Sequence, residues 1–183
     1  MAENGKMLHQ KEKNTDWSTE IKERVFHSFH RVPITVEELQ LKETTGTHQR
    51  VIDMVAHELI TKERIEEWKE LPGVAPGVDI SRDIVKLAAI ERHKNTGHVG
   101  LGFLGKYGLK KGAVATSIGH DSHNLVIAGV TDEDMVLAGN RVIENGGGLA
   151  IALEGKVLAD LPLPIGGLMA DEPVEVVDEK LEH

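Results

Sequence analysis

The sequence predicts an α+β fold, in which a largely antiparallel sheet, or sheets, carries a few packed helices. Three observations support this prediction. Strand-like runs follow one another closely after residue 111, helical periodicity is concentrated in one segment, and turn residues separate the elements. Strands joined by such short connections pair antiparallel, because parallel pairing needs a long crossover.

The strand-like runs are apolar and bounded by polar turns. GAVATSI (112–118) and HNLVIAGV (123–130) are each typical of a strand with little exposed surface. GLAIALEGKVLADL (148–161) predicts a hairpin with Glu154 and Gly155 near its turn, and prolines end it.

Residues 131–145 form the clearest predicted helix. Thr131 can cap its first turn and Asp134 stands three positions later, close to the spacing of a capping box. Helical periodicity places four apolar residues on one face, namely Met135, Ala138, Val142 and Ile143. The glycines from Gly146 onward end the helix.

The first half of the chain gives weaker signals. PITVEELQL (33–41) has the T-x-x-E spacing of a capping box and predicts a short helix. QRVIDMVA (49–56) favours a strand, whereas 58–68 is compatible with a strand or a helix. Two prolines and two glycines predict a loop at 71–79, and 80–92 suits either a helix face or a buried strand.

Glycines divide residues 97–112, which we expect to be rich in loops. They form no phosphate-binding loop, because G-x-x-x-x-G-K-[ST] is absent. The basic triplet 92–94 is expected to be a solvated strand end. Lys86 lies inside an apolar run, where a charge needs a partner, so we expect it to be paired.

The composition excludes several classes of protein. The net charge of −9 and the lack of a Lys/Arg run argue against binding to nucleic acid or to an anionic membrane surface. No apolar stretch approaches the roughly 18 residues of a membrane span. The absence of cysteine removes a cysteine-ligated zinc site and fits a reducing compartment, so we expect a cytoplasmic protein.

One segment concentrates side chains that can perform chemistry. His120, Asp121, Ser122, His123 and Asn124, hereafter the HDSHN loop, stand between two apolar runs. Histidine can transfer protons, aspartate can orient a histidine, and asparagine offers both a donor and an acceptor. The candidate catalytic residues are therefore His120, Asp121 and His123, and the candidate substrate-binding residues are Ser122 and Asn124.

The alternative for this loop is a structural turn, because aspartate, serine and asparagine favour turns. The residues alone leave the two readings about equal. A metal site is not expected in this chain, since His-x-x-His without a clear third ligand is a weak signal.

Several segments together closely resemble the C-terminal domain of bacterial adenine deaminases of the amidohydrolase superfamily. The matching segments are ERHKNTG (91–97), GLKKGAVATSIGHDSHN (108–124), GVTDEDMVLAGN (129–140), GGGLAI (146–151) and LPLPIGGLM (161–169). Their combination at this spacing is more specific than any one of them, and looser similarity extends the resemblance to about residues 20–175.

The resemblance implies hydrolytic deamination of adenine to hypoxanthine and ammonia, a step of purine salvage, by a metal-bound hydroxide. In that family manganese or iron is held by histidines and acids of an N-terminal (β/α)8 barrel. No segment here matches that barrel, so we expect it to be absent, and the fragment to hold no metal and to be inactive alone. The implied partners are adenine and the chain's own N-terminal barrel, and a homo-oligomer is compatible with the sequence.

The resemblance also suggests how the chain is organised. We expect residues 1–20 to be a polar segment left from an upstream region and 21–178 to be the domain, with a possible loop break near 71–79. Residues 181–183 resemble the start of a vector-derived tag.

Within a full-length enzyme, this domain is expected to close the mouth of the barrel, with the HDSHN loop facing the substrate. Two alternatives stay open. The domain can be purely structural or oligomeric, or it can be a free-standing module that binds a purine or a similar small ligand.

Overall fold

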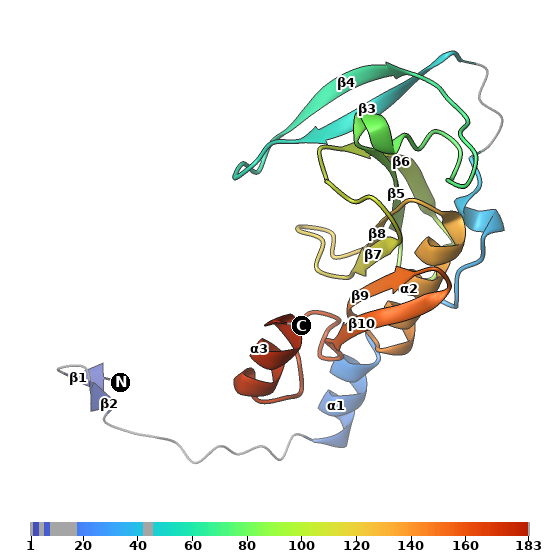
Figure 1. Cartoon of the computed structure of the whole chain (residues 1–183). Helices are drawn as coiled ribbons and strands as arrows, with labels where there is room; N and C mark the ends of the chain where they lie inside the picture. The colour runs from blue at the N-terminus through green and yellow to red at the C-terminus, as the bar shows by residue number, and fades with distance from the viewer. Residues whose placement is uncertain (1, 4–5, 8–17, 42–45, 183) are drawn as a thin grey trace.

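The computed structural model describes residues 2–3, 6–7, 18–41 and 46–182, so most of the polar segment 1–20 lies outside the described residues. An eight-stranded open sheet with three helices forms the body of the protein (Figure 1). All but one of its strand pairs are antiparallel, which confirms the predicted α+β class. The described residues form no barrel.

The order of the strands in the sheet is β10-β9-β7-β8-β5-β6-β3-β4, and only β3 and β6 pair in parallel. The strands are β3 (His48–Met54), β4 (Thr61–Glu67), β5 (Ile84–Ile90), β6 (Val99–Gly105), β7 (Ala113–Thr116), β8 (Leu125–Gly129), β9 (Gly148–Leu153) and β10 (Lys156–Pro162). Two short strands outside this sheet, β1 (Ala2–Glu3) and β2 (Lys6–Met7), pair antiparallel with each other. The helices are α1 (Thr19–Phe26), α2 (Asp132–Glu144) and α3 (Val174–Glu182).

Helix α2 forms where the periodicity predicts it and supplies the main core. The backbone N–H of Asp134 donates to Thr131 Oγ1 at 3.4 Å, which confirms the predicted cap. α2 packs on β7, β8, β9 and β10. The fully buried side chains at this contact are Met135, Ala138 and Val142 of the helix and Ala113, Ala115, Ile127, Ala150 and Ala152 of the strands.

The charge inside β5 has the expected partner. Lys86 is completely buried, and its Nζ donates to Asp132 Oδ1 at 2.6 Å. Asp132 begins α2, so this ion pair joins the middle of the sheet to the N-terminus of the main helix. The expectation that Lys86 is paired is confirmed.

The strand prediction holds over 112–130, and β9 and β10 form the predicted hairpin. In the first half, the ambiguous segments 58–68 and 80–92 contain β4 and β5. Segment 33–41 contains only a 3-10 turn at Glu37–Leu39, shorter than an α-helix. The capping spacing still operates, because the backbone N–H of Thr35 donates to Glu38 Oε2 at 3.1 Å.

The stretch 97–112, expected to be rich in loops, contains strand β6, so that part of the prediction was wrong. The glycines with left-handed φ angles, Gly97, Gly108 and Gly112, all lie outside β6. Within the strand, Leu101 and Phe103 pack against core clusters, and this burial makes an extended backbone favourable despite the glycines.

Two glycine features of β6 have structural explanations. A Cβ at Gly105 would lie 2.1 Å from Asp53 Oδ1, so the missing side chain leaves room for that carboxylate. GLGFLG (100–105) has the spacing of a dinucleotide fingerprint, but the segment lies within a strand and not at a strand-to-helix turn. It therefore lacks the structural context that binds a dinucleotide.

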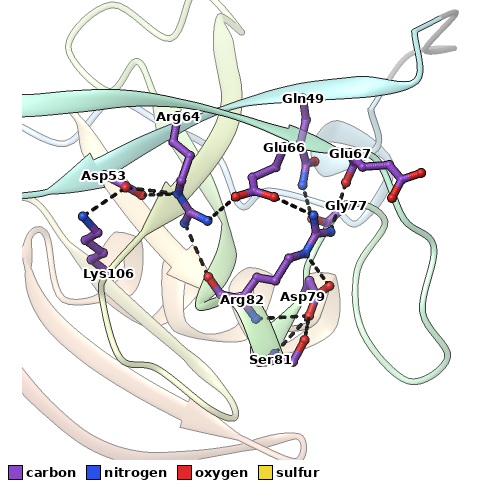
Figure 2. Close-up of polar contacts among 10 residues, drawn as sticks. All are labelled: Gln49, Asp53, Arg64, Glu66, Glu67, Gly77, Asp79, Ser81, Arg82 and Lys106. Atoms are coloured by element: carbon purple, nitrogen blue, oxygen red, sulfur yellow. Dashed lines mark hydrogen bonds and ion pairs between the residues drawn. The ribbon is translucent and has the colours of Figure 1, made fainter.

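A chain of ion pairs joins the β3–β4 hairpin to the body of the sheet (Figure 2). Arg64 bonds to Asp53 at 3.0 Å and to Glu66 at 2.7 Å, and Arg82 bonds to Glu66 at 2.8 Å and to Asp79 at 2.7 Å. Burial of Asp79 alone would raise its pKa, but hydrogen bonds from its partners outweigh burial and lower that pKa to about 2. The network fixes the hairpin at the edge of the sheet farthest from β9 and β10 (Figure 1).

Candidate functional site

Four connecting segments meet at one end of the sheet. The pairs Ile90↔Leu125, Thr116↔Leu149 and Pro162↔Gly148 place the ends of β5, β7 and β10 beside the starts of β8 and β9. The segments that leave or enter the sheet at this end are 91–98, 117–124, 145–147 and 163–169. They contain all or part of four of the motifs that carry the family resemblance, so these parts of the motifs lie together in space.

Arg92 lies at the centre of this junction. Its Nε donates to the carbonyl of His123 at 2.5 Å, Nη2 to the carbonyl of Gly166 at 3.0 Å, and Nη1 to that of Ser28 at 3.4 Å. The guanidinium lies 4.8 Å from the centre of the Phe29 ring. One arginine thus ties together three segments that are distant in sequence.

The expectation that Arg92 belongs to a solvated strand end was wrong, because the residue is only 1% exposed. Burial lowers the pKa of its guanidinium, which nevertheless stays protonated near neutral pH. The other two members of the triplet, His93 and Lys94, are exposed as expected.

Ser117 forms a second buried connection beneath the loops. Its hydroxyl donates to the carbonyl of Gly167 at 2.5 Å and accepts from the backbone N–H of Gly148 at 2.8 Å. Gly167 has a φ of +74°, and a Cβ there would lie 2.7 Å from Arg92 Nη1. A Cβ at Gly147 would in turn lie 2.3 Å from the Cα of Gly167. Close backbone approach therefore explains these glycines.

Glu91 shapes the loop that follows β5. Its carboxylate accepts from the backbone N–H groups of His93, Lys94 and Thr96 at 2.6, 2.8 and 2.9 Å. The bond from Thr96 is the main cause of a pKa lowered to about 2, against a smaller opposing effect of burial. The loop holds the ring of His93 so that Nε2 lies 2.8 Å from the carbonyl of Ser122.

The HDSHN loop lies on this base with its first side chains in solvent. The side chains of His120 and Asp121 are 88% and 89% exposed, and His120 Nδ1 lies 2.6 Å from Asp121 Oδ1. The ring centres of His120 and His123 are 6.4 Å apart at an interplanar angle of 81°. The structure therefore brings the three candidate catalytic side chains close together, with His120 and Asp121 exposed and His123 half-buried.

The two candidate substrate-binding residues differ in exposure. Ser122 is exposed and Asn124 is half-buried, with the Asn124 N–H 3.5 Å from Ser122 Oγ. His123 is also half-buried, and its Nδ1 has no hydrogen-bond partner among the described residues. Its backbone N–H donates to the carbonyl of Gly119 at 2.5 Å, which closes the loop on itself.

The described residues do not offer a metal site. Within residues 2–3, 6–7, 18–41 and 46–182, no three His, Cys, Asp or Glu side chains come close enough to hold a metal ion. The HDSHN loop supplies two imidazoles and one carboxylate, and that carboxylate, of Asp121, already contacts His120. In the same ranges, no helix is long and apolar enough to cross a membrane.

A hollow with a volume of about 460 Å³ lies beside the junction, between α1 and residues 165–171. Apolar Phe26 and Ile165 line it together with charged Lys22, Glu23 and Asp171. Its size is within the range of small-molecule pockets, but the HDSHN side chains do not line it.

Comparison with known proteins identifies the class. Residues 58–183 match the sequence model of the adenine deaminase C-terminal domain. The adenine deaminase of Lysinibacillus sphaericus is 40% identical over 182 residues, and those of Oleidesulfovibrio alaskensis and Kosmotoga olearia are 48% and 49% identical over 151 and 138 residues. The chain therefore belongs to the adenine deaminase C-terminal domain family, as the resemblance predicts.

The matches cover 99%, 82% and 75% of this chain, but only 30%, 26% and 24% of those relatives. The chain thus spans less than a third of the length of the curated relatives that it matches.

Sequence reasoning found the exposed part of this site but missed its buried base. Arg92, Ser117 and Glu91 hold the loops, and none of them was a candidate. The partners of Arg92 lie 31, 64 and 74 residues away along the chain, so no local pattern marks their contact. The only sequence signal is a charged residue directly after a buried strand, which is equally typical of a solvated end.

Proposed function

We propose that this chain is the C-terminal domain of a full-length adenine deaminase, an enzyme that hydrolyses adenine to hypoxanthine and ammonia, and that the HDSHN loop completes its active site. The observation that carries this proposal is a contrast within the loop. His120 and Asp121 are almost fully exposed, whereas the backbone behind them is bonded to buried Arg92 and to His93.

A catalytic or binding group needs a fixed backbone beneath an exposed side chain. Reacting groups must be held close to their productive geometry, and supporting hydrogen bonds supply that order. In the HDSHN loop, two backbone carbonyls, those of Ser122 and His123, are fixed from below. The side chains above them stay free to meet another surface.

Each candidate has a role in this proposal. His120, oriented by Asp121, and His123 hydrogen-bond the purine or transfer a proton to it or from it. Ser122 and Asn124 offer donors and acceptors to the ring nitrogens. When the loop lies over the substrate, it also excludes water from the reaction.

The metal of this family does not fit the described residues of this chain. We assign the manganese or iron to the remainder of the full-length enzyme, expected to be an N-terminal barrel. The roles proposed above for the side chains of the HDSHN loop do not require any of them to bind the metal. Accordingly, the isolated chain loaded with manganese should release no more ammonia from adenine than a control without protein.

Two other functions compete with this one. In the first, the domain only stabilises or oligomerises the enzyme, and the hydrogen bonds of Arg92 and Glu91 serve a structural turn. In the second, the chain is a free-standing module for a small ligand, for which the hollow between α1 and residues 165–171 is the supporting observation.

Variants of the full-length enzyme that carries this domain test the proposal. His120→Ala and His123→Ala should lower kcat/KM for adenine by about 10²–10⁴-fold in metal-replete enzyme, which is the usual contribution of general acid–base groups. The melting temperature of His120→Ala should change little, because that side chain is almost fully exposed. His123 is half-buried and has a positive φ of 48°, so His123→Ala should lower the melting temperature modestly, and its kcat/KM is compared per folded molecule.

The matched control is His57→Asn. His57 is exposed in the connection between β3 and β4, which lies at the other end of the sheet, and asparagine tolerates its positive φ of 63°. This variant should keep normal kcat/KM. Near-normal kcat/KM in both loop variants would contradict the proposal and leave the loop as a structural turn.

A further inference from the structure

The sheet has a second face, opposite the one that packs on α2. Side chains alternate along a strand, so residues paired across strands mark each face. One row of successive pairs runs Gly100–Ala89–Val126–Thr116–Leu149, and the next runs Gly102–Leu87–Ala128–Val114–Ile151. These ten positions, hereafter the bare face, alternate with core residues such as Ala115 and Ile127 that contact α2.

The described chain covers only part of the bare face: one of its ten residues is buried, six are half-buried and three are exposed. Ala128 belongs to a core cluster against which Leu87, Val74, Ile80 and Leu109 pack, and this cluster shields one corner of the bare face. Helix α3 packs on β10, at the edge of the sheet, and α2 lies on the opposite face. Ala89, Gly100 and Ile151 are exposed, and Ile151 keeps 43% of its surface accessible.

The chemistry of the bare face is uniform. None of its ten residues is charged, and its single hydroxyl, Thr116 Oγ1, accepts a hydrogen bond from the backbone N–H of Ile118 at 3.0 Å. Glycine, alanine and valine dominate, so another backbone can approach closely. A continuous uncharged apolar surface of this kind marks a protein–protein contact, and it offers nothing to a phosphate or a metal.

The bare face is continuous with the candidate site. Thr116 is the last residue of β7 and pairs with Val126 near the start of β8, and the HDSHN loop connects these two strands. Figure 1 shows this connection projecting away from α2. A partner seated on the bare face would therefore lie directly against the HDSHN loop.

We infer that the bare face is the surface on which the remaining part of the full-length adenine deaminase docks. This inference rests on the proposed function. The chain spans only 24–30% of the relatives described above, so most of such an enzyme is available as the occupant. A second copy of this chain fits less well, because each copy carries a net charge of −9 and like charges repel.

Cysteine labelling tests the inference because the chain contains no cysteine. Ala89→Cys and Ile151→Cys place single thiols on the bare face. Leu59→Cys is the matched control, because Leu59 is fully exposed in the β3–β4 connection, away from that face. Each variant is made in this chain and in the full-length enzyme. The rate of reaction with a bulky maleimide is followed at the introduced site by mass spectrometry.

In this chain alone, all three thiols should react, each at a rate that its own exposure sets. In the full-length enzyme, Ala89→Cys and Ile151→Cys should react at least about tenfold more slowly, because a docked surface must open before the reagent enters. Leu59→Cys should keep its rate. Melting curves confirm that each variant is folded, and two independent bare-face positions guard against a local distortion.

Undiminished labelling of both bare-face thiols in the full-length enzyme would overturn the inference. Protection already present in this chain alone, together with a dimer mass in sedimentation, would overturn it in favour of a second copy. Deamination of adenine by the same full-length preparation is measured separately. Protected thiols in an enzyme that does not deaminate adenine would refute the proposed function alone, and reactive thiols in an active enzyme would refute the docking surface alone.

Discussion

Replacing Arg92 with methionine should destabilise this domain more than any exposed arginine substitution. Methionine fills much of the same space but donates no hydrogen bond. The change leaves three carbonyls without their donor, those of His123, Gly166 and Ser28, in a place where Arg92 itself is 1% exposed.

The magnitude follows from the geometry of the three bonds. Two are well formed at 2.5 and 3.0 Å, and the third is long at 3.4 Å. A buried acceptor that loses its partner costs about 1–3 kcal/mol. The two carbonyls are on half-buried residues, so the two good bonds predict a loss near the lower end of about 2–6 kcal/mol in the free energy of unfolding. Arg92→Lys should recover only part of this loss, because an ammonium cannot reproduce the planar guanidinium fork.

Urea unfolding followed by circular dichroism measures this loss by linear extrapolation. The matched control is Arg50→Met. Arg50 pairs with Glu63 at 3.1 Å, but both side chains are more than half exposed, so its loss should be far smaller. Equal stability of Arg92→Met and the wild type, or equal losses in the two variants, would refute the view that Arg92 organises the junction.

Lys86→Met should lower the free energy of unfolding, measured in urea, by about 3–5 kcal/mol, because it leaves Asp132 without its partner. The double variant with Asp132→Asn should lose less free energy than the sum of the two single variants. Additive losses would contradict the pairing. Gly167→Ala should destabilise by about 1–3 kcal/mol more than Gly166→Ala, since both have positive φ but only the former would meet Arg92, and equal melting temperatures would argue against that close approach. The pKa of Glu91 is lowered to about 2 from an ordinary 4.5, so the stabilising effect of its carboxylate is present above pH 4.5 and is lost as the pH falls toward 2. In the wild type, the urea midpoint should therefore fall between pH 6 and pH 3, and in Glu91→Gln this fall should be smaller. An equal fall in the two proteins would exclude this role of Glu91.

The parts of the fold that sequence predicts are those governed by local patterns. Helix α2 combines a cap, a single apolar face and a glycine stop, and each of these is visible within a few neighbouring residues. The β9–β10 hairpin likewise has its turn residues between two apolar runs. Strand β6 escaped prediction because its stability comes from pairing with β5 and β3, which outweighs the low strand propensity of glycine.

The candidate site divides in the same way. The HDSHN loop is recognisable because five polar residues interrupt apolar sequence, and the exposure of its first three residues follows from that pattern. Its orientation depends on Arg92 and Ser117, which act through contacts with Gly166 and Gly167 across the fold. Helices α1 and α3 were not predicted; both are short, and neither buries a residue in the core.

Protection of a loop cysteine by ligand reports whether the HDSHN loop lies at the adenine site of the full-length enzyme. Ser122 is exposed, so Ser122→Cys in the full-length enzyme provides a thiol within the loop. Saturating hypoxanthine, the reaction product, should slow its reaction with a maleimide several-fold, while Leu59→Cys should react at the same rate with and without the ligand. If hypoxanthine binds and the Ser122→Cys thiol reacts at an unchanged rate, the loop does not face the bound purine and the account is wrong.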